Sequence, residues 1–235
     1  MGRATAHLFA DEGANVAVTD VDSNGVDAVV AEIVNAGGTA QGWRMDVSDA
    51  AEVSATVDAV ASAFGGLAVV VNNAGIAAAI AVDHPDYEDT WARTIEVLLT
   101  GQVRIIRAAL PHLRSARHPR VINIASTEGW GATRLASPYT AAKHGVVGLT
   151  KSLAVELGRE QITVNCVCPG PINTAMTAGI AEEDKVVFAR RRTALGRYGS
   201  PEEVAHATLN FALPSSSYMT GCVLPVDGGL LIKNA

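Results

Sequence analysis

The sequence predicts one three-layer α/β/α domain built on a doubly wound parallel sheet. Short runs of β-branched and other apolar residues alternate with longer segments that show helical periodicity. The runs at 67–71 and 162–168 are apolar at most positions, which is typical of strands buried on both faces. The chain has 235 residues, of which 49% are hydrophobic, so it can bury one sizeable core. No linker, repeat or low-complexity tract indicates a second domain, so residues 1–235 are expected to form one unit.

The individual elements follow from periodicity and from their stop signals. Strands are expected at residues 15–20, 39–47, 67–71, 120–126, 162–168 and 222–226. Helices are expected at residues 2–12, 24–35, 49–64, 87–113, 137–160 and from 201 to about 214. Ser200, Pro201 and Glu203 form a strong helix start, with an N-cap serine, a proline at the first position and a capping-box glutamate. Residues 174–197, which carry the arginine run 190–192, are expected to be irregular and mobile.

Composition argues against several classes of function. The net charge is −6 and no lysine or arginine stripe is present, which argues against nucleic-acid and acidic membrane partners. No signal-peptide run and no 18-residue apolar span occurs, so a soluble cytoplasmic protein is expected. Cys166, Cys168 and Cys222 lie in apolar runs and are odd in number. They are expected to be reduced core residues, and no metal site is predicted.

Polar residues gather where the expected strands end. In a parallel doubly wound sheet, ligands bind beyond the carboxyl ends of the strands. The polar residues at these ends are Asp20, Asp46, Asn72, Asn73, Ser126 and Thr174. Asp20 lies 18 residues after Gly2, close to the separation between a phosphate-loop glycine and the acid that binds ribose hydroxyls. A carboxylate there repels a 2′-phosphate, which favours NAD over NADP, although Asp20 also fits a plain strand-ending turn.

The stretch from Arg120 to Lys151 can bring a hydroxyl, a phenol and an ammonium to one point. Ser126 ends an expected strand, and Tyr139 and Lys143 lie four residues apart near the start of the next helix, on one face. An ammonium beside a phenol favours the phenolate, so Tyr139 could exchange a proton nearer neutral pH than free tyrosine does. Ser126 could donate a hydrogen bond to the same substrate oxygen. The alternative is a packed ring beside a solvated amine, a common pair on helices.

A combination of motifs carries a family resemblance. The residues are Asn72–Gly75 (Asn-Asn-Ala-Gly), Ser126 thirteen positions before Tyr139, Tyr139-x-x-x-Lys143, and Pro169-Gly170. With these motifs the chain resembles the classical short-chain dehydrogenase/reductase family over essentially its whole length, most of all bacterial 3-oxoacyl-carrier-protein reductases and small-alcohol dehydrogenases. The resemblance implies a Rossmann-type fold and an NAD(P)(H)-dependent oxidoreductase that interconverts secondary alcohols and ketones. It also implies a homodimer or homotetramer.

The resemblance assigns roles to matching positions. It implies that Tyr139 is the general acid/base, that Lys143 lowers its pKa and holds the nicotinamide ribose, and that Ser126 polarises the carbonyl. Asp46 and Val47 would flank the adenine. The implied cofactor-binding residues are Gly2, Asp20, Asp46, Val47, Asn73, Gly75, Tyr139, Lys143, Ile172 and Thr174.

The start of the chain departs from the family pattern. Family members begin with an apolar strand and a Gly-x-x-x-Gly-x-Gly turn that cradles the pyrophosphate, whereas this sequence begins at what resembles the last glycine, Gly2. Because the absent strand is central in the family's sheet, we expect a gap between the strands at Asn15 and Leu67, with unpaired backbone groups. Each such buried group costs on the order of 1 to 3 kcal/mol. We therefore expect the functional protein to begin upstream of Met1, or this chain to be a truncated form.

A second departure lies in the helix expected at 87–113. The family usually has Val-Asn-Leu where this chain has Val97-Leu98-Leu99, and the asparagine helps to hold a water that relays protons through the lysine. Leu98 can neither donate nor accept a hydrogen bond. Together with the truncated phosphate turn, this leaves an alternative open: a catalytically silent relative that acts as a binding or assembly module.

Replacing Leu98 with asparagine tests the second departure. We expect Leu98→Asn to raise the turnover number of an otherwise weak enzyme, because the amide restores a hydrogen-bonding group to the proton relay. The measurement is kcat for ketone reduction. If kcat does not rise, the relay is not the limiting defect.

Overall fold

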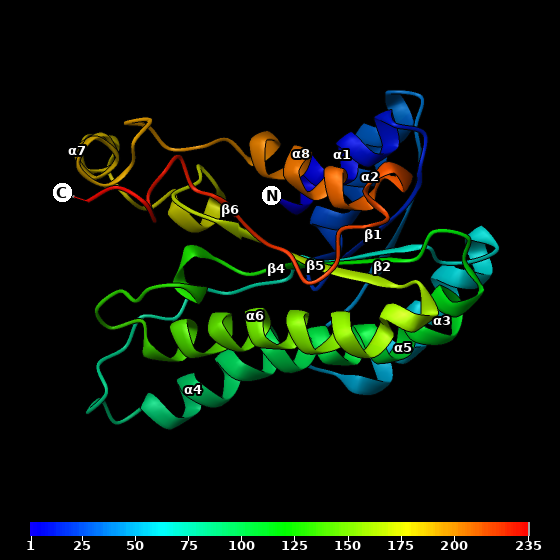
Figure 1. Cartoon of the computed structure of the whole chain (residues 1–235), viewed down its shortest axis with the longest axis horizontal. Coiled ribbons are helices and arrows are strands. Elements are labelled where there is room, and N and C mark those ends of the chain that lie inside the picture. The colour runs from blue at the N-terminus through cyan, green and yellow to red at the C-terminus, as the bar shows by residue number, and fades with distance from the viewer. Residues whose placement is uncertain (235) are drawn as a thin grey trace.

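Parallel strands lie between two layers of helices in the computed structural model, which describes residues 1–234 (Figure 1). The strands are β1 (Asn15–Asp20), β2 (Thr39–Arg44), β3 (Val69–Asn72), β4 (Arg120–Ile124), β5 (Thr163–Pro169) and β6 (Val223–Val226). The helices are α1 (Gly2–Asp11), α2 (Ser23–Asn35), α3 (Ala50–Phe64), α4 (Tyr87–Ile95), α5 (Gly101–Ser115), α6 (Ser137–Leu157), α7 (Glu182–Arg192) and α8 (Pro201–Ala212). Helices α1, α2 and α8 cover one face, and α3 to α6 cover the other (Figure 1). No helix within residues 1–234 is long and apolar enough to cross a membrane.

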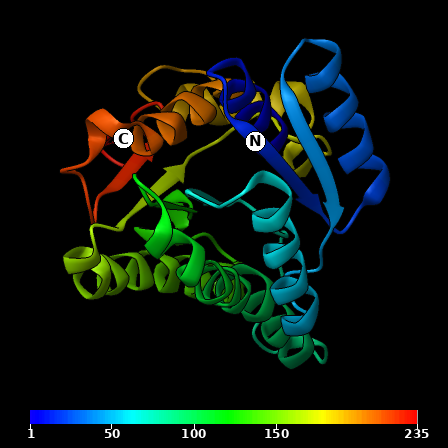
Figure 2. The same cartoon turned by 90° about the vertical axis from the view of Figure 1, so that its right-hand side faces the viewer.

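The strands form two separate parallel sheets. β1 pairs only with β2, and the second sheet has the order β3-β4-β5-β6. Figure 2 shows the β1–β2 pair standing apart from the other strands. The gap expected between the strand at Asn15 and the strand near Leu67 is therefore present within residues 1–234.

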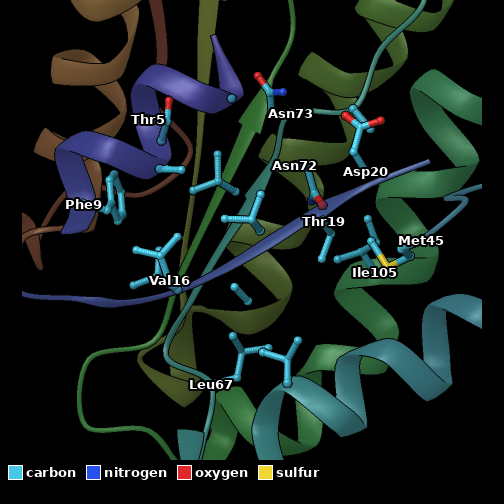
Figure 3. A pocket seen from close by; sticks show the side chains of 18 of the residues that line it. Thr5, Phe9, Val16, Thr19, Asp20, Met45, Leu67, Asn72, Asn73 and Ile105 are labelled. Atoms are coloured by element: carbon cyan, nitrogen blue, oxygen red, sulfur yellow. The ribbon is translucent and has the colours of Figure 1, made fainter. Parts of the chain in front are cut away.

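A cavity of about 910 Å³ occupies this gap. Its walls are largely apolar and come from α1, β1, the segment leading into β3, and α5, as Phe9, Val16, Leu67 and Ile105 illustrate in Figure 3. Every residue of β4 and β5 is buried, whereas β1 is half buried or exposed along its whole length. The facing edges of β1 and β3 thus border a cavity instead of a neighbouring strand.

Buried polar side chains cross the core on the α5 and α6 side of the sheet. Asn72 Nδ2 donates to Asn123 Oδ1 at 2.9 Å, and Asn123 Nδ2 donates to Thr150 Oγ1 at 2.9 Å. Thr150 Oγ1 in turn donates to the Val146 carbonyl at 2.8 Å. These hydrogen bonds connect the end of β3 to β4 and to α6. They therefore fix the position of α6 relative to the carboxyl edge of the sheet.

The long helix expected at 87–113 is interrupted. A π-helical turn, η1 (Glu96–Thr100), separates α4 from α5. Leu98, within this turn, is fully buried. Leu99 packs closely on Gly145, since a Cβ added to Gly145 would lie 2.7 Å from Leu99 Cδ2. The wider turn is compatible with two consecutive leucines both facing the interior.

The expectation of an irregular segment at 174–197 is wrong for residues 182–192, which form α7. The acidic residues of its first turn and the arginines of its last turn suit the helix dipole, and this charge order was visible in the sequence. The capping box at the start of α8 is confirmed: Glu203 N donates to Ser200 Oγ at 3.3 Å, and Ser200 N donates to Glu203 Oε2 at 2.8 Å.

Supplying a strand to the gap should stabilise the protein. We expect a fusion that places a six-residue apolar strand and a glycine-rich turn before Met1 to add about 3 kcal/mol or more, from several new backbone hydrogen bonds. That corresponds to a rise in Tm of about 6 to 12 °C, measured by calorimetry. The control is the same extension with proline at the two central strand positions. Equal Tm values for both extensions would show that the gap does not accept a strand.

Candidate active site

β4 and α6 bring Ser126, Tyr139 and Lys143 together. Ser126 lies two residues beyond the end of β4, and Tyr139 and Lys143 lie in the first two turns of α6. Lys143 Nζ is 5.5 Å from the centroid of the Tyr139 ring, and the Ser126 hydroxyl lies close enough to the Tyr139 phenol to affect its pKa. A hydroxyl, a phenol and an ammonium therefore converge beyond the carboxyl end of a central strand.

Lys143 is almost completely enclosed, with 4% of its surface exposed. Its Nζ donates to the Ile124 carbonyl at 2.9 Å. Burial lowers the pKa of Lys143 to about 8, because the charged ammonium loses hydration. The ammonium form still predominates at neutral pH, so Tyr139 has a cation beside it.

The acidity of Tyr139 differs from the sequence-based expectation. Burial raises the pKa of Tyr139, the nearby Ser126 hydroxyl opposes this, and the Glu128 carboxylate raises the pKa further. The expected lowering by Lys143 is not the dominant effect, because the ammonium lies over the ring and is hydrogen-bonded to a backbone carbonyl. The protein alone does not make this phenol more acidic.

Six of the residues expected to bind the cofactor share one cavity. Residues from α1, β1, the segment after β2 and the segment after β3 meet around the gap between the two sheets. These cavity-lining residues are Gly2, Asp20, Asp46, Val47, Asn73 and Gly75. Figure 3 shows Asp20 and Asn73 near one another at one end of this cavity.

The two carboxylates at this edge also shape their own turns. Asp20 is exposed, and its Oδ1 accepts from Asp22 N at 3.0 Å, so Asp20 forms the strand-ending turn that its position also suggested. Asp46 Oδ1 accepts from Ser48 Oγ at 2.6 Å and from Ser48 N at 2.8 Å. The hydrogen bonds from Ser48 lower the pKa of Asp46, so this side chain is ionised at neutral pH.

The start of α1 fits a phosphate only in part. A Cβ at Gly2 would lie 2.7 Å from Asn73 Nδ2, so a larger residue there would displace the Asn73 side chain. No side chain caps the first turn of α1, which leaves its amide groups suited to an anion. Within residues 1–234, Gly2 is the one glycine that corresponds to the glycine-rich turn of such a phosphate site.

Ile172 and Thr174 lie after β5, outside the lining of the large cavity. Ile172 is buried and forms a parallel bridge with Gly199. Thr174 caps a short 3-10 turn at Ala175–Thr177, with its backbone N donating to Thr177 Oγ1 at 3.0 Å. They lie beyond the carboxyl end of β5, which pairs with β4, and no hydrogen bond within residues 1–234 joins them to the residues that line the large cavity.

Trp130 lies in the loop between Ser126 and Tyr139 and is 53% exposed. Asn123 was not expected from the sequence. Asn123 links β3 to α6 through its side-chain hydrogen bonds. Its place within an apolar strand indicates such a role, because a buried amide needs hydrogen-bond partners. All three cysteines are free thiols, and Cys166 and Cys168 are fully buried. Within residues 1–234, no cluster of three or more histidine, cysteine or carboxylate side chains could hold a metal ion.

Comparisons with known proteins cover nearly the whole chain. Residues 1–231 match a family model described as Enoyl-(Acyl carrier protein) reductase. The chain is 40% identical to the (2S)-[(R)-hydroxy(phenyl)methyl]succinyl-CoA dehydrogenase subunit BbsD of Thauera aromatica, over 97% of this chain and 91% of that relative. It is 37% identical to the 3-oxoacyl-[acyl-carrier-protein] reductase FabG of Thermotoga maritima, over 99% and 94%. A solved double mutant of a Serratia marcescens short-chain dehydrogenase/reductase superposes with a TM-score of 0.90 at 33% identity, over 97% and 92% of the two chains.

The buried ammonium of Lys143 should make stability depend on pH. The unfolded chain keeps this proton up to about pH 10.4, whereas the folded protein releases it near pH 8, so its cost is largest below pH 8 and disappears above about pH 10.4. We expect Lys143→Met to raise the free energy of unfolding by about 1 to 3 kcal/mol at pH 7, with the gain shrinking towards pH 10. Denaturant titrations at several pH values measure this.

Lys151→Met is the control for this experiment, because Lys151 is exposed on the same helix. A stability difference between Lys143→Met and wild type that stays constant from pH 7 to about pH 10.5 would contradict a lowered pKa for Lys143.

Proposed function

The chain belongs to the short-chain dehydrogenase/reductase family, and on this premise we propose that it is an NAD(H)-dependent enzyme that interconverts a secondary alcohol and a ketone, with Tyr139 as general acid/base. Membership makes it an oxidoreductase that acts on CH–OH groups with a nicotinamide cofactor. The observation that carries the proposal is the convergence of Ser126, Tyr139 and Lys143 beyond β4, on the sheet edge that also carries the cavity residues.

Each of the three side chains has a distinct task in the proposed reaction. The Ser126 hydroxyl donates a hydrogen bond to the substrate oxygen and polarises the carbonyl. The Tyr139 hydroxyl gives its proton to that oxygen during reduction and takes it back during oxidation. Lys143, held by the Ile124 carbonyl, stabilises the phenolate that forms at Tyr139. When bound, the nicotinamide cofactor supplies or accepts the hydride.

Because burial raises the pKa of Tyr139, the protein favours the protonated phenol at neutral pH. A protonated phenol is the form that ketone reduction needs, since it can donate at once. Oxidation of an alcohol needs the phenolate and is expected to become faster as the pH rises. Near neutral pH the Tyr139 phenol is therefore in the form that reduction uses.

The cofactor is proposed to lie along the carboxyl edge. Its adenosine would occupy the end of the cavity between Asp20, Asp46 and Val47, and its nicotinamide would approach Tyr139. The exposed Asp20 carboxylate would accept hydrogen bonds from ribose hydroxyls and repel a 2′-phosphate, which supports NAD over NADP. The residues proposed to hold the cofactor are Gly2, Asp20, Asp46, Val47, Asn73, Gly75, Tyr139, Lys143, Ile172 and Thr174.

We further propose that residues 1–235 act as a single Rossmann-type domain and that its full phosphate cradle needs a strand and turn between β1 and β3. The facing strand edges and the uncapped start of α1 support this. The substrate is proposed to be a small molecule, since both curated relatives have a hydroxyl or oxo group in the substrate for which they are named. A cytoplasmic homodimer or homotetramer is the proposed working form, without nucleic-acid or membrane partners.

A second candidate is a catalytically silent relative that acts as a binding or assembly module. Two observations favour it: the sheet is divided beside the phosphate site, and the fully buried Leu98 replaces the usual asparagine. This candidate predicts a stable fold without cofactor-dependent chemistry.

A cofactor and ketone assay tests the proposal. We expect NADH to bind at least about tenfold more tightly than NADPH, because Asp20 repels the 2′-phosphate. We also expect ketone-dependent loss of NADH absorbance, with kcat reduced about 10²- to 10⁴-fold in Tyr139→Phe, because the proton donor is lost. Tyr218→Phe is the matched control, since Tyr218 is fully exposed.

The two candidates give opposite results in this assay. Turnover that disappears in Tyr139→Phe and persists in Tyr218→Phe supports the enzyme. Neither NADH nor NADPH binding at millimolar concentration, with no turnover of any ketone or alcohol in a panel, rejects the enzyme and supports the module.

A further inference from the structure

The Glu128 carboxylate lies within the loop that separates Ser126 from Tyr139 and accepts three hydrogen bonds. Thr133 N donates to Glu128 Oε2 at 3.0 Å, and Thr133 Oγ1 donates to Glu128 Oε1 at 2.6 Å. Thr140 Oγ1 donates to Glu128 Oε2 at 2.6 Å. Hydrogen bonds to an ionised acceptor are stronger than neutral ones, so one side chain holds both the loop and the first turn of α6.

The turn that carries Glu128 also contacts the neighbours of the reactive groups. In the 3-10 turn η2 (Thr127–Gly129), Glu128 N donates to Ser126 Oγ at 3.2 Å and Gly129 N donates to Ser126 O at 2.9 Å. A Cβ at Gly129 would lie 3.0 Å from the carbonyl oxygen of Lys143. The turn is thus fixed to Ser126 at one end and lies directly against the backbone of Lys143.

The rest of this loop is not in a relaxed conformation. Leu135 has a φ of 67°, in the left-handed region that a leucine rarely adopts. Its carbonyl accepts from Ile80 N at 2.7 Å, a contact with another loop. A strained loop persists only where tertiary contacts hold it, and the Glu128 hydrogen bonds are the charged contacts within it.

We propose that Glu128 is a positioning residue: its carboxylate ties the turn after Ser126 to the helix that carries Tyr139 and Lys143, and so fixes the three groups in reactive geometry. This inference rests on the oxidoreductase function proposed above. Glu128 holds the site through its contacts with Ser126, Thr133 and Thr140 and is not placed as a proton donor.

The charge of Glu128 has a measurable effect besides positioning, which is its effect on the pKa of Tyr139. The carboxylate disfavours a second negative charge nearby and therefore raises the pKa of Tyr139, in addition to the larger effect of burial. Removing the charge should let the phenolate form at lower pH. A residue that only stabilised the loop would not move this titration.

Four variants separate the positioning effect of the Glu128 hydrogen bonds from the effect of the Glu128 charge on Tyr139. Glu128→Ala removes both, and we expect kcat to fall about 10- to 100-fold with little change in KM for NADH, because reactive groups are displaced. Glu128→Gln keeps the size of the side chain and removes its charge. The rise of the alcohol oxidation rate with pH, which follows ionisation of Tyr139, should therefore occur at lower pH. Thr140→Val removes one hydrogen bond and keeps the charge, so kcat should fall without this shift, and Thr140→Ser should restore kcat. The control, Glu156→Gln on an exposed part of α6, should match wild type.

Failure of this inference is distinct from failure of the proposed function. If wild type reduces a ketone with NADH while Glu128→Ala keeps kcat within about twofold and Glu128→Gln leaves the pH dependence of oxidation unchanged, the positioning role is overturned and the oxidoreductase remains. If wild type shows no turnover, the inference is tested by following tyrosinate absorbance as the pH is raised. The titration of Tyr139 is the difference between each protein and the same protein carrying Tyr139→Phe. A lower midpoint for Tyr139 in Glu128→Gln supports the inference, and an unchanged midpoint overturns it.

Discussion

The hydrogen bond from the Lys143 ammonium to the Ile124 carbonyl joins the catalytic helix to the end of the central strand, and the proposed chemistry depends on it. Burying a charged amine is unfavourable, and one backbone carbonyl compensates only part of that cost. The position is therefore one where stability is given up for a fixed cation beside a phenol. Because β4 and β5 are buried at every position, the carbonyl that receives this hydrogen bond is itself rigidly placed.

A second constraint couples the two halves of the proposed site. The buried hydrogen bonds that run from Asn72 through Asn123 to Thr150 connect the end of β3 with α6. Asn73, at the proposed cofactor edge, follows Asn72 directly, and Thr150 lies two turns along α6 from Lys143. Movement of this edge relative to α6 would break polar contacts inside an apolar core, where unpaired groups are costly.

The sequence was sufficient wherever local pattern decides the outcome. Strand β1, the capping box at Ser200 and the helical spacing of Tyr139 and Lys143 all follow from short stretches, and all appear as expected. The charge order of α7, acidic in its first turn and basic in its last, is also a helix signal within a short stretch. The π-helical turn around Leu98 was not predictable, because it depends on how two leucines pack against other elements. The direction of the Tyr139 pKa was also missed, because burial is a property of the tertiary structure.

The division of the sheet has a consequence for how the protein opens. The β1–β2 pair and α2 are linked to the remainder through α1, which packs on α8, and through β2, where Trp43 packs on Phe64 of α3 and Arg44 pairs with Glu52. The Arg3–Glu32 ion pair that joins α1 to α2 is exposed at the surface. With no strand ladder between β1 and β3, this part can detach without first disrupting the other four strands. Amide protons of β1 and β2 should then exchange with solvent well before those of β4 and β5, so the chain behaves as two foldons instead of one cooperative unit.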